Sequence, residues 1–137
     1  MMSKIRFLRT RLDFGLLAIL VLTCFAAIPV LSNAGLPNGS DVLYHTYRVA
    51  EMQRSWEHGL LFPAWAEGLY FGYGSPLFHF YAGVTYYLTS LIITILNTTA
   101  LDALRIVLLL SFWGCSTGMY LFVRRRAGQL GGVIAGL

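Results

Sequence analysis

Three long apolar stretches, separated by polar segments, dominate the pattern of hydrophobic and polar positions. They cover residues 14–31, 77–96 and 103–123, and a further apolar run begins at residue 129. A helix of about 20 apolar residues is long enough to cross a bilayer. In lipid, only helices and closed barrels satisfy all their backbone hydrogen bonds internally. The pattern therefore predicts an all-α, polytopic transmembrane helix bundle with three spans and the start of a fourth.

The segments between these stretches give the remaining divisions. We expect a basic N-terminus over 1–13, an outer loop over 32–76, a short turn over 97–102 and a basic loop over 124–128. The last apolar run, 129–137, is too short to cross a bilayer. We therefore interpret the chain as the N-terminal portion of a longer polytopic protein, whose remaining transmembrane helices would complete the bundle.

The first apolar stretch has two interpretations. It is uncharged over residues 14–31, which is longer than the ~7–15 apolar residues of a typical signal peptide core. The small residues at 32–34 leave room for cleavage after it, and Pro29 could end or kink the helix. The length favours a retained membrane anchor over a cleaved signal peptide.

The composition agrees with a membrane protein. Of the 137 residues, 57% are hydrophobic and only 12% are charged, about half the charge of a typical soluble domain. The basic residues stand next to apolar segments, at Lys4, Arg6, Arg9 and Arg11 and again at Arg124, Arg125 and Arg126. Such clusters usually contact phospholipid headgroups. We therefore expect membrane lipids as partners and no nucleic acid.

The placement of lysine and arginine also predicts an orientation. Basic loops stay in the cytoplasm, so the N-terminus should be cytoplasmic and the loop 32–76 should lie outside. With three spans, the turn 97–102 would then lie inside and Arg124–Arg126 outside, against the same rule. Either the first span sets the orientation, which is the interpretation we keep, or the number of spans is wrong by one.

The outer loop holds most of the acidic residues and histidines of the chain. Four acidic residues and all the histidines fall within residues 38–81. The part after Asp41 lacks glycine and proline until Gly59, which predicts an amphipathic helix over about 41–58 at the outer membrane face. On helical spacing, Val42, Val49 and Trp56 share one side of this helix, and Asp41, His45, Arg48 and Met52 lie along another.

Aromatic residues and glycines dominate the rest of the loop. Trp65, Tyr70, Phe71 and Tyr73 fit a belt of aromatic side chains at the membrane interface. Tyrosine hydroxyls in the following apolar stretch need hydrogen-bond partners or a polar groove, and this concerns Tyr81, Tyr86 and Tyr87. The histidines lack the compact spacing of a zinc site, so we assign no metal ligands.

The order of these features resembles the N-terminal end of the glycosyltransferase C superfamily, polytopic enzymes that take sugars from polyprenyl-phosphate donors. The resemblance is carried by GSDVLYHTYRVAEMQRSWEHGLLFPAW, by GYGSPLFHFY and by RIVLLLSFWGCSTGMYLFVRRRAG. More closely, the amino-acid sequence resembles that of the bacterial membrane proteins labelled "6-pyruvoyl-tetrahydropterin synthase-related". The resemblance implies a multi-pass protein of the bacterial cell membrane that transfers a sugar from a polyprenyl-phosphate donor at the outer face.

The resemblance also implies roles for residues of the outer loop. The family's acidic residue maps onto Asp41, which would act as the catalytic base for an acceptor hydroxyl or would help to hold a divalent metal. A divalent cation is thus the one cofactor that the resemblance allows, and none is established by the sequence. Arg48 would bind a phosphate of the donor and His45 would orient Asp41. Glu51 and Tyr73 complete the predicted substrate-binding residues.

Each of these residues also has a structural interpretation. Asp41 could cap the helix that follows it, Arg48 could pair with Glu51 one turn later, and His45 could simply be solvated. The alternative for the whole protein is a non-catalytic polytopic membrane protein, such as a scaffold, part of a transporter or a lipid-handling protein. In either case, we expect this chain alone to be inactive as an enzyme.

Overall fold

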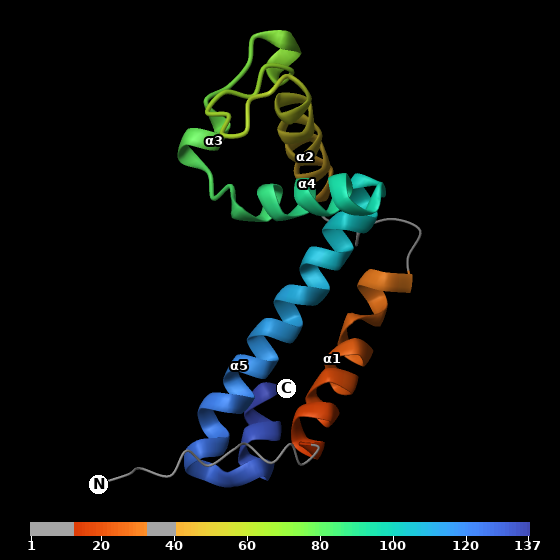
Figure 1. The fold of residues 1–137 in the computed structure, drawn as a ribbon, viewed down its shortest axis with the longest axis vertical. Helices are drawn as coiled ribbons and strands as arrows, with labels where there is room; N and C mark the ends of the chain where they lie inside the picture. Colours follow the sequence, from red (N-terminus) through yellow and green to blue (C-terminus); the bar gives the residue numbers. More distant parts are fainter. Residues whose placement is uncertain (1–12, 33–40) are drawn as a thin grey trace, which may run out of the picture. The chain divides into compact units, whose positions relative to one another are not determined.

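The computed structural model describes residues 13–32 and 41–137 and shows an all-α fold (Figure 1). Within these ranges, the only strand-like pairing is an isolated antiparallel bridge between Ala66 and Ser75. The prediction of an all-α chain is confirmed for the described residues. The helices are α1 (Phe14–Ser32), α2 (Val42–Glu57), a short 3-10 helix η1 (Tyr70–Gly72), α3 (Leu77–Phe80), α4 (Val84–Leu96) and α5 (Ala100–Gly136).

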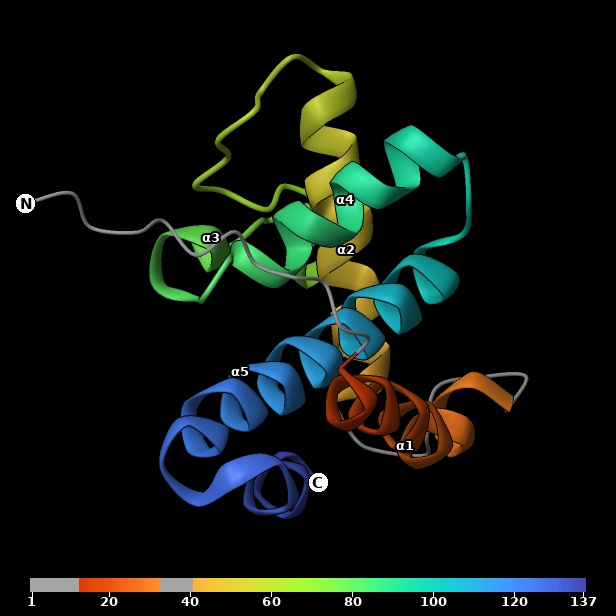
Figure 2. The same ribbon diagram turned by 60° about the horizontal axis from the view of Figure 1, so that its bottom comes forward.

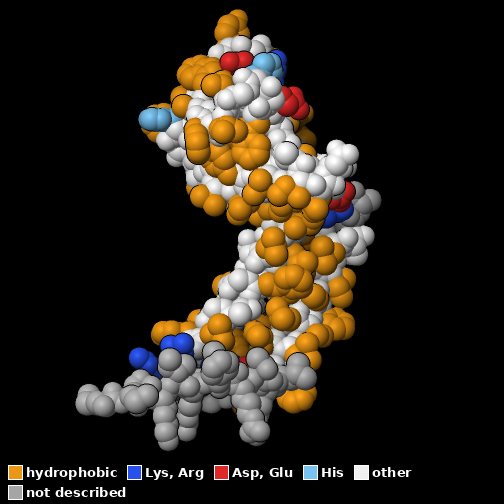
Figure 3. Space-filling model, in the orientation of Figure 1, with side chains coloured by type: hydrophobic (Ala, Val, Ile, Leu, Met, Phe, Trp, Pro, Cys, Tyr) orange, Lys and Arg blue, Asp and Glu red, His pale blue; other side chains and the backbone are white. Residues whose placement is uncertain are grey.

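Two of these helices, α1 and α5, are long and apolar enough to cross a membrane. Their large apolar side chains are mostly exposed, including Phe14, Phe25 and Phe122. Only 22% of the most apolar window of α1 and 11% of that of α5 is buried, whereas the core helix of a soluble protein would be mostly buried. Figure 3 shows hydrophobic side chains spread over the visible surface of these helices. Exposed apolar helices of this length are typical of membrane spans.

The segment 77–96, predicted as one span, is divided in the structure. The short helix α3 ends at Phe80, Tyr81 is extended (φ −101°, ψ 145°), and α4 begins after Gly83. With 13 residues, α4 is about 20 Å long, less than the ~30 Å of a bilayer's hydrocarbon core. Gly83 lowers the helix propensity at this point, and the ring of Tyr81 contacts Arg48 instead of continuing the helix. The described residues thus contain two candidate spans, and a three-span bundle is not confirmed.

The predicted basic loop 124–128 is also different in the structure, because α5 continues through all three arginines. Arginine has a high helix propensity and does not end a helix by its charge. The break comes only at Gly128, whose backbone has a φ of 73° and a ψ of −176°. This region of backbone conformation is essentially restricted to glycine. Figure 2 shows the chain turning back after this point.

The chain divides into two compact units, which are described separately. The first comprises residues up to 26 and residues 112–137, of which 13–26 and 112–137 are described; the second comprises residues 27–111. In the first unit, the segment 129–136 packs closely on the preceding part of α5. A Cβ atom added at Gly132 would lie 2.9 Å from the Arg124 Cβ atom, and one at Gly136 would lie 2.8 Å from the Ser116 carbonyl oxygen. The G-x-x-x-G spacing therefore permits the close contact of two helical segments.

In the second unit, α2 packs against α4 around a small apolar core. The core consists of Val49, Met52, Tyr86 and Leu104, with Trp56, Phe78, Tyr87, Ile93 and Ala100 packed against it. The bounds of α2 agree with the helix expected over about 41–58. Helical spacing groups Met52 with Asp41, His45 and Arg48, but Met52 is fully buried in the same core as Val49. The apolar side of α2 is thus covered by protein in this unit, and its placement at a membrane face stays a prediction.

A capping motif sets the start of α5. The Asp102 backbone amide donates to Thr99 Oγ1 at 3.2 Å, and that hydroxyl donates to Asp102 Oδ2 at 2.8 Å. Asp102 also forms an ion pair with Arg105 at 2.9 Å. Asn97 ends α4 in the left-handed conformation (φ 49°). These contacts make the segment 97–99 a tight connection between α4 and α5.

Candidate functional site

An open groove of about 690 Å³ in the second unit contains two of the predicted site residues. Asp41 and Arg48 line it together. The other lining residues are mostly aromatic and come from α2, from the loop before α3 and from the start of α3: Tyr44, Tyr47, Gly68, Leu69, Tyr70, Phe71 and Leu77. The groove therefore combines one carboxylate, one guanidinium and several aromatic rings.

Arg48 and His45 meet at the hydroxyl of Tyr86. Arg48 Nη1 donates to Tyr86 Oη at 3.1 Å, and His45 Nδ1 lies 3.0 Å from the same oxygen. Tyr86 is one of the buried residues of the core between α2 and α4. The sequence indicated that this hydroxyl needs a partner, and the structure supplies two. His45 thus contacts Tyr86 on a neighbouring helix rather than the predicted partner Asp41.

The guanidinium of Arg48 is also stacked on an aromatic ring. Its Cζ atom lies 4.2 Å from the ring centroid of Tyr81, within the range of a cation–π contact. Tyr81 reaches this position because it lies in the extended break between α3 and α4. The predicted pairing of Arg48 with Glu51 is absent, since the ion pairs of the described residues involve other side chains.

These contacts change the proton affinity of both partners. Burial raises the pKa of Tyr86, and the adjacent Arg48 partly opposes this. Burial tends to lower the pKa of Arg48, but hydrogen bonds to Tyr86 and Tyr81 outweigh it and raise the pKa. At neutral pH, Tyr86 is therefore a neutral hydroxyl and Arg48 a permanent cation.

Asp41 occupies the N-cap position of α2 but does not cap it through its side chain. Its backbone is helical (φ −94°, ψ −12°), and its carboxylate makes no capping hydrogen bond to the described amides of the first turn. An N-cap side chain normally needs an extended backbone to reach these amides. The structural interpretation of Asp41 as a cap is therefore wrong for this structure. The residues before it, including Ser40, lie outside the described residues.

Glu51 and Tyr73, the other predicted site residues, lie apart from the groove lining. Glu51 Oε2 accepts a hydrogen bond from the Gly68 backbone amide at 2.8 Å, which ties α2 to the loop that follows it. It also lines a second, smaller cavity of about 260 Å³ with Arg54, His58 and Trp65, among others. Tyr73 is 86% exposed and follows the η1 turn.

The aromatic loop beside the groove has an unusual backbone. Tyr70 and Phe71 have positive φ values of 52° and 61°, which are uncommon for aromatic residues. The Ala66–Ser75 bridge holds the base of this loop, with backbone N···O distances of 2.7 and 3.0 Å. Phe71 is fully exposed. Sequence reasoning identified these aromatics but could not show that two of them line the same groove as Asp41.

No group of three or more histidine, cysteine or acidic residues that could hold a metal ion occurs among residues 13–32 and 41–137. Cys24 and Cys115 are both free thiols. The chain matches no family model, no curated protein and no solved structure. The site therefore has to be interpreted from its own geometry.

Proposed function

We propose that this chain is part of a membrane glycosyltransferase-like protein whose groove receives the phosphate end of a polyprenyl-phosphate sugar. The observation that carries the proposal is that Asp41 and Arg48 line one groove while the Asp41 carboxylate is not used as a helix cap. A base and a phosphate-binding cation in one groove are what the transfer of a sugar from a phosphate leaving group requires.

Arg48 has the properties of a phosphate ligand. Its side chain is held by the Tyr81 ring and by the Tyr86 hydroxyl, so little conformational entropy is lost when it binds. Nη1 donates to Tyr86 and the guanidinium also interacts with Tyr81, but a guanidinium has five N–H donors, so others remain for phosphate oxygens. Tyr44 and Tyr47 add exposed aromatic surface to the same groove.

In the proposed reaction, Asp41 accepts the proton of an acceptor hydroxyl as the acceptor oxygen attacks the anomeric carbon of the sugar. The bond between that carbon and the phosphate oxygen breaks, and polyprenyl phosphate leaves with the electron pair. Arg48 stabilises the negative charge that develops on the phosphate. The acceptor proton ends on the Asp41 carboxylate, so charges and atoms balance.

The proposal includes the setting of the groove. The chain lies in the bacterial cell membrane as part of a multi-pass protein, with its N-terminus in the cytoplasm and the groove at the outer face. Membrane lipids and further transmembrane helices surround the candidate spans α1 and α5. A divalent cation, if the reaction uses one, would need oxygen ligands in addition to Asp41.

Substitution of Asp41 tests the catalytic part of the proposal. The assay uses membranes in which the natural protein is replaced by its Asp41→Asn variant. Transfer from a radiolabelled polyprenyl-phosphate sugar should fall by at least about 100-fold, the usual contribution of a general base. Glu57→Gln is the matched control, because Glu57 is an exposed acid at the other end of α2. Wild-type turnover by the Asp41→Asn variant would remove Asp41 from the mechanism.

Substitution of Arg48 tests the binding part. Arg48→Lys keeps the charge but loses the planar fork of the guanidinium. The capture of the protein by a photoreactive polyprenyl phosphate, measured as crosslinked product, should therefore fall about tenfold or more. Arg54→Lys serves as the control, since Arg54 is on α2 but lines the other cavity. Equal capture by the two variants would contradict a phosphate contact at Arg48.

The alternative is a non-catalytic protein that binds a lipid phosphate in the same groove. One observation favours it: Asp41 is the only acidic residue among the described residues that line the groove. The two functions differ in the experiments above. A non-catalytic lipid-binding protein would show the loss of capture in Arg48→Lys, but no transfer would be detected even with the wild-type sequence.

A further inference from the structure

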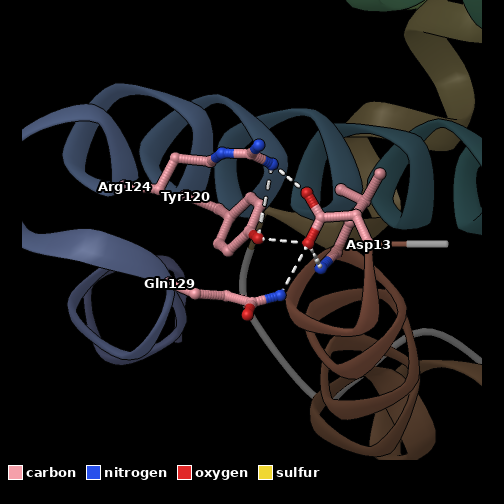
Figure 4. A network of polar contacts seen from close by, with 5 residues as sticks. Asp13, Tyr120, Arg124 and Gln129 are labelled. Carbon is pink, nitrogen blue, oxygen red and sulfur yellow. Dashed lines mark hydrogen bonds and ion pairs between the residues drawn. The ribbon is translucent and has the colours of Figure 1, made fainter. Parts of the chain in front are cut away.

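A network of four side chains ties the start of α1 to the last part of α5 (Figure 4). Asp13 Oδ1 accepts from Tyr120 Oη at 2.5 Å and from Gln129 Nε2 at 3.0 Å, and Asp13 Oδ2 forms an ion pair with Arg124. Asp13 also caps α1 by accepting from the Leu16 amide at 3.3 Å. All of these residues belong to the first unit. One carboxylate thus joins three helical segments at one end of this unit.

A second contact defines the direction of the two helices. Trp113 Nε1 donates to the Leu20 carbonyl oxygen at 3.2 Å. From Asp13 to Leu20 the chain advances along α1, whereas from Arg124 to Trp113 it goes back along α5. The two helices are therefore antiparallel, with residue 13 opposite residues 120–124 and residue 20 opposite residue 113.

We propose that α1 and the segment 100–127 form a two-span membrane hairpin, whose basic end binds the anionic headgroups of the cytoplasmic leaflet. The start of α1 and the arginines at 124–126 then lie on one side of the membrane. By chain connectivity, residues 33–99 leave from and return to the opposite side. The turn 97–99 thus lies on the same side as the groove, which reverses the placement expected for a three-span protein.

The hairpin removes the conflict between the charges and the positive-inside rule. With three spans, Arg124–Arg126 would be outside and the basic N-terminus inside. With two spans, both clusters lie in the cytoplasm, because Arg11 stands only two residues before Asp13 in the sequence. Arg125 and Arg126 are exposed and take no part in the Asp13 network, so their charges remain available for phospholipid headgroups.

The same contacts support a retained α1. A cleaved signal peptide has no need of a specific partner in the mature protein. Here the start of α1 contacts Tyr120, Arg124 and Gln129 through Asp13. Gly15 lies so close to Tyr120 that an added Cβ atom would be 2.5 Å from its hydroxyl oxygen. Such complementarity indicates that α1 stays paired with α5.

Cysteine accessibility separates the two topologies. With Cys24 and Cys115 replaced by serine, single cysteines are introduced as Asn97→Cys and Arg126→Cys in the natural protein. A membrane-impermeant maleimide should label Asn97→Cys in intact cells, and should label Arg126→Cys only after permeabilisation. Glu57→Cys, on α2, is the positive control for the outer side, and Arg125→Cys replaces Arg126→Cys if the latter is not produced.

The opposite pattern overturns the hairpin. Labelling of Arg126→Cys but not of Asn97→Cys in intact cells is the result that three spans predict. Labelling of both positions without permeabilisation also contradicts the proposal, because the two ends of the segment 100–127 would then share one side. This experiment does not depend on any sugar transfer, so it stands or fails separately from the proposed enzymatic function.

Lipid composition tests the headgroup contact. In vesicles of phosphatidylcholine with about 30% phosphatidylglycerol, the purified protein should unfold at a higher temperature than in phosphatidylcholine alone. The double variant Arg125→Gln, Arg126→Gln should lose most of this difference. The control Arg54→Gln should keep it. An unchanged shift in the double variant would show that these arginines do not bind the anionic headgroups.

Discussion

The guanidinium carbon of Arg48 lies 4.2 Å from the ring centroid of Tyr81, a residue in the break between α3 and α4. The same guanidinium donates to Tyr86 on α4. The break in the apolar stretch 77–96 therefore has a local consequence, because it brings one tyrosine under Arg48 and another beside it. In one uninterrupted helix, residues five positions apart would project in different directions and could not flank one cation in this way.

Removal of the Tyr86 hydroxyl should destabilise the second unit. In Tyr86→Phe, Arg48 and His45 both lose their common partner in a buried position, and we expect a loss of about 1–3 kcal/mol in the free energy of unfolding. Thermal denaturation of the protein in detergent, followed by circular dichroism, measures this. Tyr87→Phe is the control, since no hydrogen bond between described residues joins the Tyr87 hydroxyl to this core; it should change stability by less than about 0.5 kcal/mol.

The raised pKa of Tyr86 predicts a loss of stability in alkali. Because the pKa of this tyrosine is higher in the folded than in the unfolded chain, the unfolded chain loses its proton first as the pH rises. The stabilisation is therefore complete below the unfolded value of about 10 and is lost as the pH rises through the folded value. Above about pH 10, the wild type should lose up to ~1.4 kcal/mol per pH unit relative to Tyr86→Phe. Parallel pH profiles for the two proteins would contradict this shift.

Glu51 should act on the loop rather than on a ligand. Its carboxylate accepts from the Gly68 amide at 2.8 Å. Loss of this contact in Glu51→Ala should loosen the loop and increase proteolytic cleavage between residues 66 and 75. Glu57→Ala, at an exposed position of the same helix, should leave the cleavage rate unchanged. A rate equal to that of the wild type in Glu51→Ala would show that the Ala66–Ser75 bridge holds the loop without this contact.

The close packing of the segment 129–136 predicts a difference between two glycines of α5. In Gly132→Ala, the new methyl group would meet Arg124 Cβ and Tyr120 Cδ2 at 2.9 Å, and we expect a destabilisation of about 1–3 kcal/mol. In Gly118→Ala, no described atom lies within 4 Å of the new group, so the change should be neutral or slightly stabilising. The melting temperatures of the two variants in detergent, compared with the wild type, test this difference.

The sequence predicted the helical class and the position of α2, because apolar length and the absence of glycine and proline are local signals. It predicted only part of the buried side of α2, since Val49 and Trp56, grouped on one side by helical spacing, do lie in the core or pack against it. Met52 was grouped with Asp41 and Arg48 by helical spacing, yet it packs beside Val49 against α4. The position of the partner helix decides which stripe of a weakly amphipathic helix is covered, and this information lies in the tertiary structure.

The candidate site was predicted only in part. Asp41 and Arg48 do line one groove, but the partners that hold Arg48 are tyrosines from a distant part of the chain, Tyr81 and Tyr86. The tyrosine hydroxyls in an apolar stretch were a signal that such partners exist. Hydropathy alone could not show the break at Tyr81, because an apolar run fits either one span or two shorter helices.

The Asp13 network had no sequence signal. Asp13 stands in a basic segment and its partners lie more than 100 residues away. The conflict of Arg124–Arg126 with the positive-inside rule is the one feature of the sequence that speaks against three spans. The pairing of α1 with α5 through Asp13 offers a physical resolution of that conflict.

Exchange of the two charges tests that pairing most directly. Asp13→Arg and Arg124→Asp should each lower the melting temperature of the protein in detergent, because each places like charges opposite one another. The double variant with both substitutions should recover most of the loss, since an ion pair forms again in the reverse sense. If the double variant is as unstable as the sum of the two single variants, α1 and α5 are not joined by Asp13 and Arg124.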